Sequence, residues 1–204
     1  FSHDRIQVAA YALVSGPERP GVHLDIGRAL LAATGTEELE EKIFTFIDHL
    51  NDGRSLIKGG AEKRRLAELN LRAACRARTF SEFEKARQFV KTGLGLLGQD
   101  PWNDSFDLIL SLLNENAELA LITGRPEDIS GIVEEIHANT RNTLDRVRAY
   151  TVQIEAENSR YKPAVALSIG VAVLEELGIR MPSNPDFPDV LQLNRIMFDL
   201  FAQE

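Results

Sequence analysis

The sequence is poor in the residues and runs that define several classes of protein. It contains one cysteine, Cys75, so an intrachain disulfide and a thiolate metal cluster are both excluded. No apolar run approaches the roughly 18 residues that a membrane-spanning helix needs, and no signal peptide opens the chain. A lone cysteine fits a reducing compartment, so we expect a cytoplasmic location. Because Cys75 has alanine neighbours on an apolar helix face, we expect it to be a small, buried packing residue.

An excess of basic residues is also lacking, since the net charge is −8. Nucleic acids and anionic membranes are bound through basic surfaces, so neither is expected as the main partner. Instead we expect a protein or peptide partner, which includes other domains of the same chain. No cofactor is expected.

Segments that alternate apolar and polar residues are missing too, whereas Leu, Ala, Glu and Arg are abundant. The apolar residues recur with helical spacing, so the sequence predicts an all-α protein of about nine or ten helices. One of these, Pro163 to Leu177, is apolar on much of its surface, and we expect it to be well buried. The predicted helices span residues 4–14, 19–33, 36–50, 61–79, 81–98, 102–123, 126–136, 143–154, 163–177 and 189–202.

The stretch from Leu66 to Gly98 reads as two helices joined by a tight turn. Small residues recur where the two helices would meet. Ser81 followed by Glu84 fits a capping box, which predicts that Ser81 caps the second helix. The predicted packing residues of this hairpin are Ala74, Ala86 and Gly93.

Similar hairpins begin near Leu66, Ser105 and Thr143, about every 38 to 39 residues. In the second, the small residues are Ala117, Ala120 and the turn residue Gly124. This pattern is similar to tetratricopeptide repeats, although the usual large aromatics are mostly absent. The resemblance implies a superhelix of antiparallel helix pairs over residues 61–204, packed as one continuous unit.

A second resemblance covers more of the chain. The segments FSHDRIQVAAYALV, HLDIGRALLAAT, ELEEKIFTFIDHLNDGRSLI and RLAELNLRAACRAR occur in that order. They resemble large multidomain signalling kinases, both serine/threonine kinases and hybrid histidine kinases, in which helical repeats follow an AAA/STAND-type ATPase module. The resemblance implies that residues 1–60 are a helical junction at the winged-helix-like end of that module. With Phe1 as its first residue, the chain is expected to be a piece of a larger protein.

The sequence contains no pattern that supports a catalytic or metal-binding site. Residues 93–98 fit G-x-G-x-x-G, but they end a helix, whereas a dinucleotide site opens one. No P-loop motif is present, and the four histidines have no metal-ligand spacing. We therefore expect no catalytic, cofactor-binding or metal-binding residue, and no enzyme activity in this chain, even if the parent protein is a kinase.

Four arginines on one predicted helix depart from the acidic average: Arg65, Arg72, Arg76 and Arg78. They are either a contact surface for an acidic partner segment or solvated helix faces.

The sequence favours a non-catalytic interaction module that couples an ATPase module to the sensor and kinase domains of a signalling kinase. The alternative is a ligand-sensing helical-repeat domain that binds a small molecule or peptide in its groove. Its apolar pocket would contain Phe44, Phe46, Phe80, Phe83 and Phe89.

Overall fold

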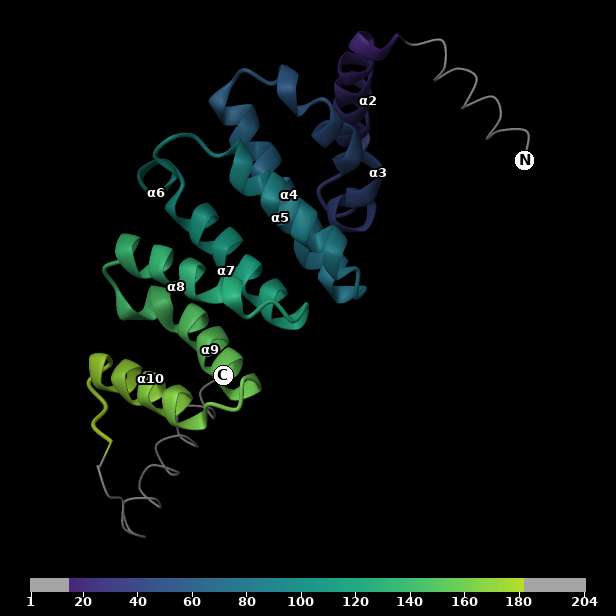
Figure 1. The fold of residues 1–204 in the computed structure, drawn as a ribbon. Helices are drawn as coiled ribbons and strands as arrows, with labels where there is room; N and C mark the ends of the chain where they lie inside the picture. Colours follow the sequence, from purple (N-terminus) through teal and green to yellow (C-terminus); the bar gives the residue numbers. More distant parts are fainter. Residues whose placement is uncertain (1–14, 182–204) are drawn as a thin grey trace. The chain divides into compact units, whose positions relative to one another are not determined.

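The computed structural model describes residues 15–181, and every regular element in that range is a helix (Figure 1). Each helix predicted between residues 15 and 181 is present, and the predictions for 4–14 and 189–202 lie outside the described range. The elements are η1 (Gly16–Glu18), α2 (Arg19–Ala33), α3 (Leu39–Asp52), η2 (Arg54–Leu56), α4 (Gly60–Thr79), α5 (Phe83–Leu96), α6 (Pro101–Asp104), α7 (Phe106–Ile122), α8 (Glu127–Asn139), α9 (Thr143–Ser159) and α10 (Pro163–Glu176).

The helix predicted over residues 102–123 is divided in two. Ser105, with φ −152° and ψ 47°, leaves helical geometry between α6 and α7. Pro101 begins α6, because a proline is favourable where no helical hydrogen bond is required of its nitrogen. The Trp102 ring then packs edge-on against Phe106, with ring centroids 5.8 Å apart.

The chain divides into two compact units, residues 1–139 and residues 140–204. The predicted boundary at residue 60 therefore falls inside the first unit, and the stretch predicted to be continuous, 61–204, is divided between Asn139 and Thr140. The reason for the first difference is the core. Ile43, Phe46 and Ile47 of α3 belong to the same buried cluster as Leu69 of α4 and Leu112 of α7.

Within the first unit, three helix pairs pack in chain order. α2 packs on α3, α4 on α5 and α7 on α8, and α3–α4, α5–α7 and α4–α7 contacts join the pairs (Figure 1). Each pair alone would leave one apolar face in water, and the next pair buries it. This serial arrangement explains why α4, in the middle, has buried residues from Leu66 to Ala77.

The turn after α4 corrects the predicted capping box. Ser81 is not the N-cap of α5: it has a positive φ of 61°, α5 begins at Phe83, and the N-cap residue Glu82 makes no side-chain capping bond. Ser81 lies in the left-handed position that ends α4. The Ser81 N–H donates to the Arg78 carbonyl and the Glu82 N–H to the Ala77 carbonyl, which is the Schellman arrangement.

The same turn recurs after α7 and α9. Gly124 (φ 68°) and Tyr161 (φ 60°) occupy the left-handed position. The following residues, Arg125 and Lys162, donate back to the carbonyls of Ala120 and Glu157. Three helix pairs of the chain are thus connected by one turn geometry, although serine, glycine and tyrosine have little in common as side chains.

In the second unit, α9 packs on α10, but few of their side chains are buried. The described buried apolar residues of these two helices are Ala149, Val152, Ala156 and Ala166. The prediction that Pro163 to Leu177 is well buried is wrong for this structure, because Val165 is 44% exposed and Leu167 65% exposed. The apolar composition predicted that neighbouring elements bury this helix, but among the described residues Val165 and Leu167 stay exposed to solvent.

Candidate functional site

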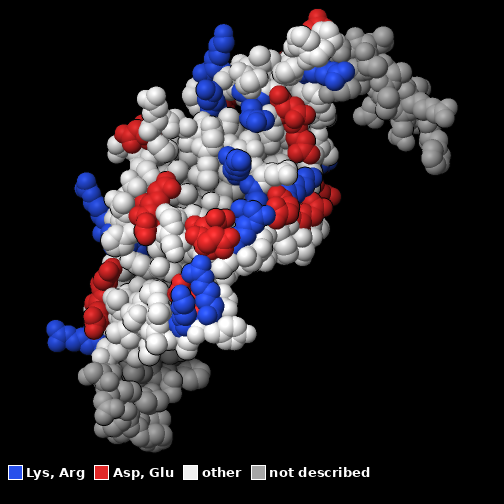
Figure 2. Space-filling view, in the orientation of Figure 1, with Lys and Arg blue, Asp and Glu red and all other residues white. Residues whose placement is uncertain are grey.

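The four arginines predicted as a contact surface all lie on α4, but they do not form one free basic area. Arg65 pairs with Glu68 of its own helix at 3.1 Å. Arg72 pairs with Glu40 of α3 at 3.1 Å. The Arg76 guanidinium lies over the Phe80 ring, 5.3 Å from its centroid. Figure 2 accordingly shows blue and red side chains interspersed on the visible face, so the arginine surface stays a prediction.

Arg78 has the most buried of these contacts. Its Nε donates to Glu115 Oε1 of α7 at 2.7 Å, and its Nη2 lies 3.6 Å from Glu118 Oε2. Glu115 is 1% exposed. The hydrogen bond to Glu115 raises the pKa of Arg78, so the guanidinium keeps its positive charge. Arg78 therefore joins α4 to α7 inside the first unit, and because its side chain is 32% exposed its predicted role as a partner contact stays a prediction.

The predicted packing residues lie at helix contacts or turns. Ala74, Ala86, Ala117 and Ala120 are buried. At Gly93, an added Cβ would meet Leu112 Cδ2 at 2.9 Å and the Ala67 carbonyl at 3.4 Å, so α5 approaches both α4 and α7 closely there. Gly124 occupies the left-handed turn position.

The five phenylalanines of the ligand-sensing hypothesis do not line a common cavity. Phe46 and Phe89 belong to the buried core, Phe44 stacks on Phe89 with centroids 6.1 Å apart, and Phe83 packs against the same core. Phe80 is exposed at the end of α4. None of them lines either of the two pockets described below.

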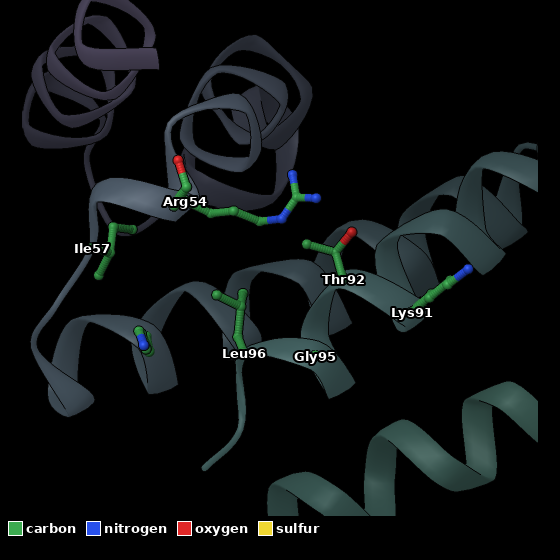
Figure 3. Close-up of a pocket in the computed structure, with 8 residues that line it drawn as sticks. Arg54, Ile57, Lys91, Thr92, Gly95 and Leu96 are labelled. Atoms are coloured by element: carbon green, nitrogen blue, oxygen red, sulfur yellow. The ribbon is translucent and has the colours of Figure 1, made fainter.

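A basic pocket of about 450 Å³ lies where η2, α4 and α5 meet. We call it the η2 pocket. Figure 3 shows the Arg54 side chain extending from η2 towards Thr92 of α5, with Leu96 and Ile57 on the other side. Gly95 forms part of the wall, and no atom lies within 4 Å of the position its Cβ would take. The lining residues are Arg54, Ser55, Ile57, Lys63, Lys91, Thr92, Gly95 and Leu96.

A second pocket of about 380 Å³ shares Lys91 with the η2 pocket. We call it the α5–α7 pocket. It contains the amide side chains of Gln88 and Asn116 and the cations Arg87 and Arg125, with one carboxylate, Glu84. Arg125 lies 3.4 Å from Glu84, and Arg87 lies 3.5 Å from Asp128, so both arginines have internal partners.

Sequence reasoning missed the η2 pocket. Its three cations, Arg54, Lys63 and Lys91, lie on three different elements, η2, α4 and α5, so no local run of sequence brings them together. The glycines at 93–98 were the available signal. Gly93 is required for close packing, but Gly95 has open space beside it, so the second glycine leaves a hollow that packing does not explain.

Two histidines also meet in a way that spacing did not predict. His23 of α2 and His49 of α3 are joined by an Nδ1–Nδ1 hydrogen bond of 2.8 Å, and His23 Nδ1 lies 3.6 Å from Asp52. The described residues nevertheless contain no group of three or more His, Cys, Asp or Glu side chains placed to hold a metal ion. The histidine pair fastens α2 to α3.

Helices long and apolar enough to cross a membrane are absent from the described residues.

The structure thus defines an all-helical region built of hairpins. The chain is similar to hybrid signal transduction histidine kinase G of Dictyostelium discoideum, with 26% identity over 200 residues that cover 83% of this chain. The chain spans 6% of that protein's length. No protein-family model matches the chain, and no solved structure does.

Proposed function

We propose that the chain is a non-catalytic interaction region of a signalling protein, which binds polypeptide segments of the same protein or of a partner. The observation that carries the proposal is the serial packing of three helix pairs in the first unit. Stacked pairs bury their apolar faces on one another and present long rows of side chains for binding. A resemblance to tetratricopeptide repeats and a place between ATPase, sensor and kinase domains of a signalling kinase are the finer parts of the proposal.

The distant relative supports a signalling context in a particular way. The match extends over most of this chain but over a small part of the kinase. A helical segment that makes up a small part of a large kinase does not need catalytic residues of its own. It can instead bind other parts of the protein and hold them in position. We expect its surroundings to be cytoplasmic, as the single cysteine indicates.

The ligand-sensing alternative has less support. It requires an apolar cavity, and the phenylalanines named for it fill the core or stand exposed at a helix end. The two pockets instead have charged and amide side chains.

The test uses the 204-residue chain and the polypeptide segments encoded on either side of it in its gene. Calorimetric titration is expected to show saturable binding of at least one flanking segment, with a dissociation constant in the micromolar range. The chain incubated with ATP is expected to release no phosphate. Failure of both segments to bind would remove the coupling role, and ATP turnover abolished by a point substitution would replace it with an enzymatic one.

A further inference from the structure

The η2 pocket combines features that packing alone does not require. Two cations from different elements, Arg54 of η2 and Lys63 of α4, line it, and Lys91 of α5 stands at its edge. We infer that this pocket binds the phosphate group of a phosphorylated polypeptide segment. The inference rests on the proposed function, since it names the chemistry of the polypeptide partner.

The charges of the pocket are not neutralised by the described part of the chain. No described carboxylate lies within ion-pair distance of Arg54, Lys63 or Lys91. Elsewhere on the first unit, by contrast, Arg28 pairs with Glu62 at 2.8 Å and Arg72 with Glu40 at 3.1 Å. In a chain of net charge −8, a pocket with three such cations is an exception. A phosphate monoester carries about −1.5 to −2 charges at pH 7, so it balances them better than one carboxylate does.

The donors of the pocket are partly fixed in place. Arg54 Nη1 donates to the Asn51 carbonyl at 2.6 Å, which holds the side chain while the guanidinium retains further N–H donors. The Ser55 hydroxyl also lines the pocket. The Thr92 hydroxyl donates its hydrogen to the Gln88 carbonyl at 2.9 Å, so it is not counted among the hydrogen-bond donors available to an anion in the pocket.

The ends of the neighbouring helices do not decide the sign of the electrostatic potential in the pocket. Lys63 lies in the first turn of α4, whose positive end favours an anion, and Leu96 is the last residue of α5, whose negative end opposes one. These effects offset each other. The cationic side chains therefore determine the preference for an anion.

A polypeptide ligand is favoured over a free anion by the neighbouring pocket. Lys91 extends away from Arg54 in Figure 3 and also lines the α5–α7 pocket, so the two hollows adjoin along α5. Gln88 and Asn116 in the second hollow can each donate to and accept from a peptide main chain. An extended segment with its phosphate in the η2 pocket can therefore continue past Lys91 into the α5–α7 pocket.

The experiment titrates the isotope-labelled 204-residue chain with three probes and follows its backbone amides by NMR. The probes are acetyl-Gly-Ala-phosphoserine-Ala-Gly-amide, the same peptide with unmodified serine, and inorganic phosphate. We expect saturable shifts at Ser55, Thr92 and Gly95 with the phosphopeptide, and about tenfold weaker binding of inorganic phosphate. Arg54→Gln and Lys63→Gln should each weaken the phosphopeptide about tenfold, because each removes a charge-assisted hydrogen bond.

Lys162→Gln is the matched control: it removes one positive charge from an exposed site in the second unit and should leave binding unchanged. Gly95→Gln and Gly95→Glu both have room for their Cβ, and they place side chains of similar size beside the pocket. Gly95→Glu should weaken binding more, because it adds a competing carboxylate.

Equal binding by the phosphopeptide and its unmodified form, or unchanged binding in Arg54→Gln and Lys63→Gln, would overturn the inference. Equal binding by the phosphopeptide and inorganic phosphate would keep the anion site and overturn the polypeptide part. If the flanking segments of the proposed function still bind while the phosphopeptide does not, the inference fails and the proposed function stands.

Discussion

The two units are built from the same kind of helix pair and differ in how their apolar faces are covered. In the first unit, α4 lies between α3, α5 and α7, and its residues Leu66, Ala67, Leu69, Ala73, Ala74 and Ala77 are all buried. In the second unit, Ala166 is the buried residue of α10. Both units nevertheless contain the same left-handed turn, at Ser81 and at Tyr161. Turn geometry is thus local, whereas burial depends on neighbouring pairs.

The largest expected difference between the units comes from truncating a core side chain. Phe46 of α3 is completely buried, so Phe46→Ala leaves a cavity and should lower the free energy of unfolding by about 3 to 5 kcal/mol. Leu167→Ala in α10, where the side chain is 65% exposed, should change it by less than about 0.5 kcal/mol. Denaturant titration, with hydrogen exchange read helix by helix, measures both. Comparable losses would show that α10 is covered much as α3 is.

The next largest effect concerns the Arg78–Glu115 pair. Arg78→Met leaves the buried Glu115 carboxylate without its main cation and should destabilise the first unit by about 3 kcal/mol. Glu115→Gln should be milder, since Arg78 is 32% exposed and can be hydrated.

The control for this pair is a double-mutant cycle with Arg78→Met and Glu115→Gln, measured by denaturant unfolding. Restoration of part of the lost stability in the double variant is expected, because position 115 then has no buried carboxylate that has lost its bond to Arg78. Strictly additive losses would mean that the two side chains act independently.

A third prediction contrasts two glycines of α5. Gly93→Ala forces a methyl against Leu112 and the Ala67 carbonyl, and we expect a net loss of about 1 kcal/mol despite better helix propensity. Gly95→Ala meets no neighbouring atom and should raise stability by about 0.5 to 1 kcal/mol. Thermal unfolding of the two variants gives the comparison directly. A stabilising Gly93→Ala would show that α5 does not approach α7 as closely as the structure has it.

The sequence predicted the parts of this structure that periodicity determines. The described helices follow the spacing of apolar residues, and Gly35, Gly124 and Pro126 lie near the predicted ends. It did not predict which helix faces meet. Arg78 and Glu115 are 37 positions apart, and periodicity assigns each to a face without naming the partner. The η2 pocket was missed for the same reason, since its cations come from three elements.

Local patterns also failed where two backbone conformations compete for one residue. Ser81 and Glu84 satisfy a capping box by spacing, but the chain uses Ser81 to end α4. Serine is common at N-caps and uncommon in the left-handed region, so propensity favoured the wrong end of the turn. The two hydrogen bonds of the Schellman turn, from Ser81 and Glu82, outweigh that preference.

A fourth prediction, with an expected effect as small as that of Gly95→Ala, tests whether the shared turn is as local as the comparison of the two units suggests. Ser81→Gly and Tyr161→Gly each relieve a side chain held at positive φ, and each should raise stability by about 0.5 to 1 kcal/mol. Tyr161 is 93% exposed, so its ring contributes little packing that glycine would lose. Hydrogen exchange at the ends of α4 and α9 reads the two turns separately, with Phe80→Gly as a control at a position of negative φ that should not be stabilised. If the two turn variants gave opposite effects, the turn would depend on its neighbours after all, and the distinction between local geometry and shared burial would have to be abandoned.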